Sequence, residues 1–174
     1  PGGFGYTQFC EHHRRWLARG GLTMRQVHKA GDKLFVDYSG KKPRVFDPDT
    51  GESREVELFV AALGASNLTY AEATETQRVA DFVGSHIRTF EYLGGVPAAL
   101  VPDRLKSAVI AGSRYETELQ RTYEDMAEFY GTAVIPARSA KPRDKAKGEG
   151  AVLIAQRWIL ARLRNERYFS LDEL

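Results

Sequence analysis

The chain contains 174 residues, of which 43% are hydrophobic, and its 25 Lys and Arg against 23 Asp and Glu give a formal net charge of +2. This composition is typical of a globular domain, and the length allows one well-buried core. No run approaches the roughly 18 consecutive apolar residues that a membrane helix needs, and no signal peptide opens the chain, so we expect a cytoplasmic protein. The single cysteine, Cys10, excludes an internal disulfide and any zinc site that needs a cysteine pair.

Charge is distributed unevenly along the chain. Residues 1–46 carry 9 basic and 3 acidic side chains, residues 47–128 carry 7 and 15, and residues 136–174 carry 9 and 5. Two basic ends around an acidic middle favour a bound polyanion, but solvated surface charge gives the same counts. Charge alone leaves both interpretations open.

The ends of the chain predict a fragment of a longer protein, because the sequence begins at Pro1 and ends in an incomplete helix-start pattern. Residues 5–21 have apolar side chains at near-helical spacing and end in two glycines, which predicts a helix. We expect a helical linker or extension over residues 1–30, a core over 31–168, and the start of a truncated C-terminal region over 169–174.

Three apolar segments separated by turn residues come next, at residues 33–39, 43–47 and 54–66. Their short connections predict three strands in an antiparallel meander. Further short apolar runs at 97–103 and 132–137 predict two more strands.

Amphipathic periodicity predicts two helices, one before the strand at 97–103 and one between that strand and the strand at 132–137. The first spans 74–95, with Thr74 as N-cap and Gln77 three residues later, and the second spans 116–131. His86 lies on the apolar stripe of the first helix, so we expect a buried histidine rather than a metal ligand.

A last helix is predicted over residues 151–165, with an apolar stripe facing inward and arginines facing out. The stripe consists of Val152, Ala155, Ile159 and Leu163. Large aromatic residues are more often part of a core than of a base-stacking surface, and we expect Trp16, Tyr115 and Trp158 to be core residues.

The predicted order is therefore βββαβαβα. Crossovers between parallel strands need helices, whereas antiparallel pairs need only turns, so this order predicts an α/β fold with a mixed five-stranded sheet flanked by helices. That is the ribonuclease H-like arrangement, in which the first strand lies at the centre of the sheet and the fourth lies beside it.

Three acidic residues lie on elements whose ends are expected to come close together in this topology. Asp37 directly follows the apolar run of the first strand, Asp103 ends the fourth strand, and Glu149 precedes the last helix. A buried carboxylate is costly without a cation, and neighbouring carboxylates repel each other unless a cation lies between them. Magnesium binds through carboxylate oxygens and substrate phosphates, so the pattern predicts a divalent metal site.

Each acid also has a structural interpretation. Asp37 could begin a turn, Asp103 could cap a following helix, and Glu149 could complement a helix dipole. Taken singly these interpretations are favoured, but the convergence of all three acids favours the metal site.

The stretches KLFVDYSG, VPDRLKSAV and KAKGEGAVLIAQRWILARLRNERYFSLDEL resemble the catalytic core of IstA-type insertion-sequence transposases, which belong to the DDE superfamily with the retroviral integrases. The resemblance implies that Asp37, Asp103 and Glu149 form the catalytic, metal-binding triad. It implies two Mg²⁺ or Mn²⁺ ions with DNA bound, hydrolysis at transposon ends, and strand transfer of the 3′-hydroxyl into target DNA. It also implies upstream helix-turn-helix domains, self-association on DNA and an IstB-type helper ATPase of the AAA+ class as partner.

Basic residues near these acids are candidates for contacts to DNA phosphates, which position a strand without reading its sequence. They are Arg104, Lys106, Lys141, Arg143, Lys145, Lys147 and Arg157. The alternative is an exposed basic loop without a ligand. Two other functions stay open: a ribonuclease H-like nuclease that never joins DNA, and an inactive DNA-binding or assembly module whose acids are structural.

Overall fold

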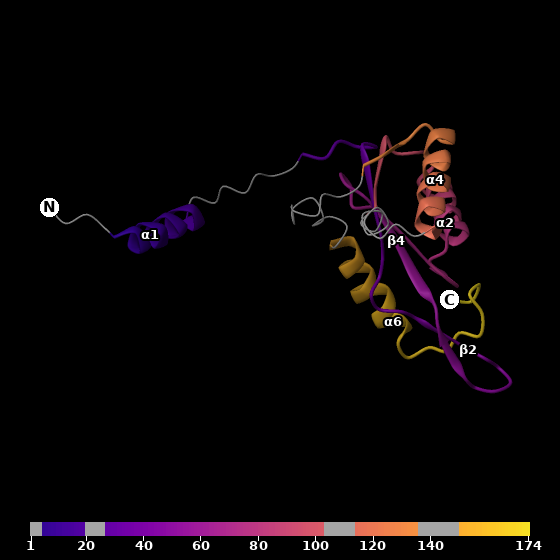
Figure 1. Cartoon of the computed structure of the whole chain (residues 1–174). Coiled ribbons are helices and arrows are strands. Elements are labelled where there is room, and N and C mark those ends of the chain that lie inside the picture. The colour runs from indigo at the N-terminus through magenta and orange to yellow at the C-terminus, as the bar shows by residue number, and fades with distance from the viewer. Residues whose placement is uncertain (1–4, 20–26, 103–113, 136–149) are drawn as a thin grey trace.

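The computed structural model describes residues 5–19, 27–102, 114–135 and 150–174 (Figure 1). Within these ranges no helix is both long enough and apolar enough to cross a membrane. Helix α1 (Tyr6–Arg19) stands apart from the sheet in Figure 1. Its aromatic side chains are exposed, at 83% for Tyr6 and 64% for Trp16. The expectation that Trp16 is a core residue is therefore wrong, because most of its side chain is exposed.

The main sheet contains five strands, as predicted. They are β1 (Lys33–Tyr38), β4 (Glu57–Leu63), β5 (Thr69–Thr74), β6 (Ala99–Pro102) and β7 (Ala133–Val134), in the spatial order β5-β4-β1-β6-β7. Strand β1 pairs antiparallel with β4 and parallel with β6, so it is central and the predicted fourth strand lies beside it. The remaining pairs are antiparallel for β4 and β5 and parallel for β6 and β7.

One predicted strand does not belong to this sheet. Strand β2 (Arg44–Phe46) pairs with β3 (Ser53–Glu55) in a separate two-stranded sheet. The third strand of the main meander is instead β5, which the sequence pattern did not predict. The predicted strand over 54–66 is divided at Val56, where the chain leaves the small sheet and enters β4.

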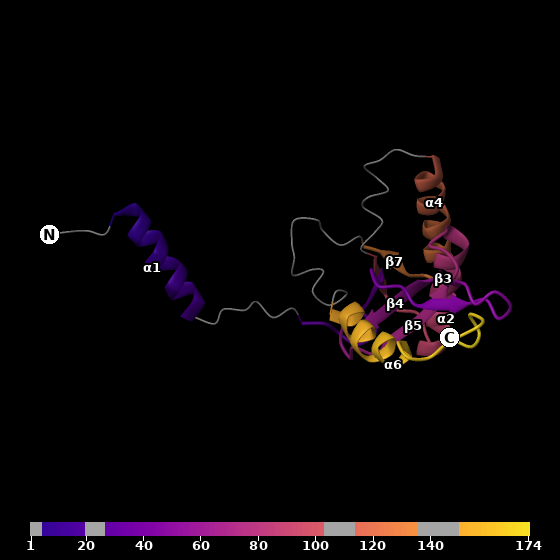
Figure 2. The ribbon, with the colours of Figure 1, turned by 90° about the horizontal axis from the view of Figure 1, so that it is seen from below.

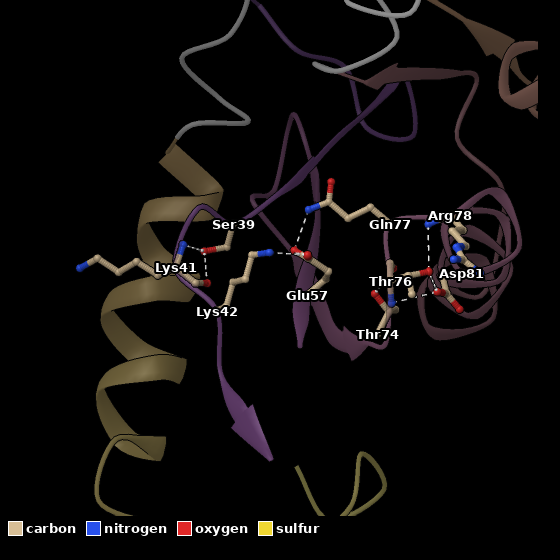
Figure 3. Close-up of polar contacts among 9 residues, drawn as sticks. All are labelled: Ser39, Lys41, Lys42, Glu57, Thr74, Thr76, Gln77, Arg78 and Asp81. Atoms are coloured by element: carbon tan, nitrogen blue, oxygen red, sulfur yellow. Dashed lines mark hydrogen bonds and ion pairs between the residues drawn. The ribbon is translucent and has the colours of Figure 1, made fainter. Parts of the chain in front are cut away.

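Two helices, α2 (Val79–Leu93) and α4 (Arg114–Phe129), cover one face of the main sheet. Helix α2 begins five residues after the predicted N-cap, because Thr74 is still the last residue of β5. The turn between them is held by Thr76, whose hydroxyl accepts the Arg78 N–H at 3.1 Å, and by Asp81, whose carboxylate accepts the Thr76 N–H at 3.0 Å (Figure 3).

His86 is fully buried in this core, as predicted. Its Nδ1 lies 2.7 Å from the carbonyl oxygen of Phe82, which can only accept, so Nδ1 carries the proton. Its Nε2 then accepts a hydrogen bond from the Tyr123 hydroxyl at 3.1 Å. Burial lowers the pKa of His86 to about 4, so the ring is neutral at physiological pH.

The opposite face of the sheet is covered by the C-terminal helix (Figure 2). Residues 150–155 are α-helical, Gln156–Leu160 form a π-helical turn (η1), and α6 (Ala161–Leu163) completes the helix. The cluster between this helix and the sheet contains Leu58, Val60, Ala62, Ala151, Val152 and Ala155. The predicted inward positions Val152, Ala155 and Ile159 are confirmed.

Candidate active site

Asp37 is the fifth of the six residues of β1 and is half-buried. Side chains alternate along a strand, and Leu34, Val36 and Tyr38 pack against α2 and α4, so Asp37 lies on the face of the C-terminal helix. Its cross-strand partner is Val60, which belongs to the cluster under that helix. One carboxylate oxygen, Oδ1, accepts the N–H of Tyr38 at 2.8 Å.

The neighbouring strand β6 ends beside this position. Val36 pairs with Pro102 in the parallel ladder, so the carboxyl ends of β1 and β6 lie at the same edge of the sheet. In the sequence, Asp37 directly follows Val36 and Asp103 directly follows Pro102. Asp103 lies outside the described residues, as do Arg104 and Lys106.

The C-terminal helix approaches the same part of the sheet. Its first described residue is Gly150, and Ala151 and Val152 are buried in the cluster that contains Val60. Glu149 directly precedes Gly150 in sequence and lies outside the described residues. The structure therefore brings together Asp37, the end of β6 and the first turn of the helix.

A polar contact connects the helix to the chain just after Asp37. Gln156 donates from Nε2 to the hydroxyl of Ser39 at 2.9 Å. Ser39 is only 2% exposed, and its hydroxyl also donates to the Lys41 carbonyl at 2.8 Å (Figure 3). The sequence analysis did not single out either residue, and a serine after a strand is a weak signal because serine is common in turns.

The segment after Ser39 is held by a second set of contacts. Lys42 Nζ lies 2.5 Å from Oε1 of Glu57, and Gln77 donates from Nε2 to Oε2 of Glu57 at 2.6 Å (Figure 3). Further along, a pocket of about 310 Å³ separates this segment from the C-terminal helix. The cations that line the pocket are Lys41, Lys42, Arg44 and Arg164.

Of the predicted DNA-binding residues, Arg157 is described, and it is exposed on the π-helical turn. The lysines and arginine of the basic loop, Lys141, Arg143, Lys145 and Lys147, lie outside the described residues. Trp158, the next residue on the helix after Arg157, is 71% exposed, so the expectation that it is a core residue is wrong. The side chain of Tyr115 is outside the described part of the chain.

The donor chemistry at Asp37 fits a divalent metal ion. A carboxylate oxygen is the ligand type that Mg²⁺ and Mn²⁺ prefer. Within the described ranges, no three His, Cys, Asp or Glu side chains are grouped closely enough to hold a metal ion. The predicted triad has two of its three members outside those ranges.

Tyr38, next to Asp37, points into the opposite core. Burial raises the pKa of its hydroxyl to about 12, so it stays protonated at neutral pH. This excludes it as a general base for the chemistry at Asp37.

No protein-family model matches the chain. Its sequence is 47% identical over 174 residues to y4uI of Sinorhizobium fredii, a protein named as a transposase, with 100% of this chain and 34% of the relative covered. It is 48% identical over 169 residues to a protein of Burkholderia multivorans named as the transposase of insertion sequence IS408, covering 97% of this chain and 33% of the relative. The chain thus spans about a third of the length of these curated relatives.

Solved structures with the same fold are catalytic cores of retroviral integrases. The HTLV-2 integrase catalytic core domain in complex with magnesium aligns with a TM-score of 0.53 at 11% identity, covering 86% of this chain and 82% of that one. A chain of the simian T-cell lymphotropic virus intasome in complex with the PP2A regulatory subunit B56 gamma aligns with a TM-score of 0.56 at 12% identity, covering 83% and 45%. The fold is ribonuclease H-like, and over its length the chain is similar in sequence to a segment of proteins named as insertion-sequence transposases.

Proposed function

We propose that this chain is the catalytic core of a DDE transposase of the IstA type, which hydrolyses DNA at transposon ends and transfers the new 3′-hydroxyl into target DNA. The observation that carries the proposal is the position of Asp37, at the sheet edge where β6 ends and on the face where the C-terminal helix begins. Asp103 and Glu149 are the residues that follow β6 and precede that helix, and we assign them with Asp37 as the triad.

In this assignment the three carboxylates are the ligands of two divalent ions, Mg²⁺ or Mn²⁺. The bound ions would supply Lewis-acid stabilisation of the attacking and leaving oxygens. The protein's part is to hold the carboxylates in place: the Tyr38 N–H orients Asp37, and the packing of Val60 against Val152 holds the helix on the sheet. Water first replaces the 3′-oxygen at a phosphodiester and frees a 3′-hydroxyl. That hydroxyl then attacks a target phosphodiester and releases the target's own 3′-hydroxyl.

Phosphate contacts would hold the DNA strand for this chemistry. The candidates are Arg104, Lys106, Lys141, Arg143, Lys145, Lys147 and Arg157. Arg157 supports the proposal because it is exposed on the same helix that packs over the Asp37 face of the sheet. The relatives are about three times longer than this chain, so we assign end recognition to other domains of the whole protein. Self-association on DNA, an IstB-type AAA+ helper ATPase and a location in the bacterial nucleoid complete the proposal.

The decisive experiment is a strand-transfer assay with the full-length transposase, end-labelled terminal DNA, a plasmid target and manganese. We expect joined product from wild type and none from Asp37→Asn or Glu149→Gln. Asp32→Asn is the matched control, because it makes the same change just before β1, at the opposite end of that strand from Asp37. Its joining activity should equal that of wild type.

Other outcomes identify the alternatives. Cleavage without joining by wild type would indicate a nuclease. DNA binding with no cleavage and no rise in melting temperature on addition of manganese would indicate an inactive binding module, since a native-state metal site must raise it. Joining that survives Glu149→Gln would assign the third ligand to another acid.

A further inference from the structure

The C-terminal helix rests on the sheet through apolar side chains, with Ile159 and Leu160 packed against the buried cluster. Ala151, Val152 and Ala155 face Leu58, Val60 and Ala62, and these contacts have no preferred direction along the helix axis. Apolar contacts are non-directional, so they define the position of the helix along its axis less sharply than a hydrogen bond does. A directional contact is needed to define that position.

The hydrogen bond between Gln156 and Ser39 supplies this direction. Gln156 Nε2 lies 2.9 Å from the Ser39 hydroxyl, and residue 39 is two positions after Asp37. The Ser39 N–H donates to the carbonyl of Leu58 at 2.9 Å, which ties the same residue to β4. Its hydroxyl donates to the Lys41 carbonyl at 2.8 Å and accepts the Lys41 N–H at 3.1 Å (Figure 3). With the bond from Gln156, the one donor and two acceptor positions of the hydroxyl are all used.

The helix departs from regular geometry at this contact. Gln156 is the first residue of the π-helical turn. Such turns within α-helices are rare overall, and those that occur are often found at functional sites. Residues that contact the sheet follow a spacing of four, from Ala155 to Ile159 and from Gln156 to Leu160. A spacing of four also fits a regular α-helix, so the spacing alone does not require the π-turn, and within this turn Trp158 faces solvent.

We propose that Ser39 and Gln156 are a positioning pair, which fixes the helix that follows Glu149 relative to the strand that carries Asp37. The proposal rests on the proposed function, because its purpose is to set the separation of two metal-binding carboxylates. Neither side chain touches the metal or the DNA in this assignment. Their contribution is to hold the helix and the strand in a fixed relative position before metal and DNA bind.

The test uses the full-length transposase with Gln156→Met, which keeps the side-chain length but removes the donor, Ser39→Ala, and the double variant. We measure the Mn²⁺ concentration for half-maximal cleavage of terminal DNA. Without DNA, we measure the Mn²⁺ concentration that gives a half-maximal rise in melting temperature. Each single variant should need about tenfold more Mn²⁺ in both measurements, the lower end of the range for residues that orient metal ligands. The double variant should need no more than either single variant, because both remove the same contact.

The matched control is Arg162→Met, an exposed residue of the same helix, and its Mn²⁺ requirement without DNA should equal that of wild type. Lower melting temperatures with an unchanged Mn²⁺ requirement would overturn the positioning role and leave a structural contact. Additive effects in the double variant would also overturn it. Failure of the proposed function is a different result: wild type that cleaves no DNA, or Asp37→Asn that still cleaves.

Discussion

At the scale of single residues, the fully buried His86 predicts how stability depends on pH. Its pKa is about 4 in the folded chain and 6.5 in the unfolded chain, so between these values the unfolded state binds a proton that the folded state does not. Stability therefore falls as pH falls from 6.5 towards 4. We expect a loss of about 2 kcal/mol between pH 7.5 and pH 5.0, from the linkage of 1.36 kcal/mol per pKa unit.

Urea unfolding at several pH values measures this loss. His86→Asn retains an N–H donor near the Phe82 carbonyl but does not titrate, so its stability should be lower at neutral pH and nearly constant down to pH 5. His13→Asn, on the exposed part of α1, is the control and should keep the wild-type slope. Equal slopes in wild type and His86→Asn would assign the pH dependence to other groups.

Asp37 shows which features of a single residue could be predicted from the sequence. Its place at the end of an apolar run predicted a strand position, and the structure confirms the strand. Ser39 and Gln156 could not be paired in advance, because 117 positions separate them and both residue types are common on surfaces. Polar side-chain pairs across such distances depend on the final packing of helix on sheet.

At the scale of elements, the end of helix α2 gives a test of backbone strain. Gly94 has a φ of 68° and donates to the Glu91 carbonyl at 3.1 Å, while Gly95 donates to Phe90 at 3.1 Å. A Cβ at either glycine meets no atom within 4 Å, so substitution tests conformation alone. Gly94→Ala should cost about 1 kcal/mol of unfolding free energy, because a side chain disfavours the left-handed conformation.

Gly95→Ala is the matched control, since its φ lies outside the left-handed region. Its effect, measured by the same urea titration, should be under about 0.5 kcal/mol, as for an ordinary surface change. Equal losses at the two positions would mean that the left-handed cap does not contribute to the end of the helix.

Strand β5 explains why one element was missed. Its sequence TYAEAT places Glu72 on the face that packs against α2, where an apolar residue is expected. Arg88 of α2 pairs with that carboxylate through two hydrogen bonds of 2.7 Å, and Tyr70 donates to it at 2.7 Å. Despite the opposing effect of burial, these bonds lower the pKa of Glu72, so the charge is kept at neutral pH. A hydrophobic pattern cannot predict a strand in which a half-buried glutamate on the helix-covered face forms an ion pair with a residue of another element.

The C-terminal helix was predicted in extent and in its buried face, but its π-turn was not. The four-residue spacing of its sheet contacts is compatible with an ordinary amphipathic stripe over two turns, so periodicity alone does not distinguish the two geometries. Trp158, which lies on this turn, is 71% exposed. The general tendency of large aromatic residues favoured a core position for this tryptophan, and the structure places it on the surface.

At the scale of the whole molecule, the basic loop before Glu149 predicts how DNA binding depends on salt. If Lys145 and Lys147 neutralise two phosphates, the double variant Lys145→Gln with Lys147→Gln should reduce the slope of log K against log salt by about 2. The measurement is binding of terminal duplex DNA by the full-length protein at several salt concentrations. Lys29→Gln with Lys33→Gln, near the opposite end of β1, makes the same charge change and should leave the slope unchanged.

An equal reduction of the slope in both pairs would indicate a general effect of net charge. An unchanged slope in the Lys145 and Lys147 variant would exclude these phosphate contacts. Either result leaves the assignment of the triad untouched, because that assignment concerns cleavage and metal binding rather than affinity.

The pairing of β1 with strands on both sides has a consequence for folding. The antiparallel partner β4 begins 19 residues after β1 ends. The parallel partner β6 comes later in the chain, after β5 and α2. Loop closure costs more entropy over the longer separation, so we expect the meander of β1, β4 and β5 to form first and β6 to join later. The edge with Asp37 is completed only by that last pairing. A chain still in the course of folding would therefore lack the assembled arrangement of strands on which the proposed site depends.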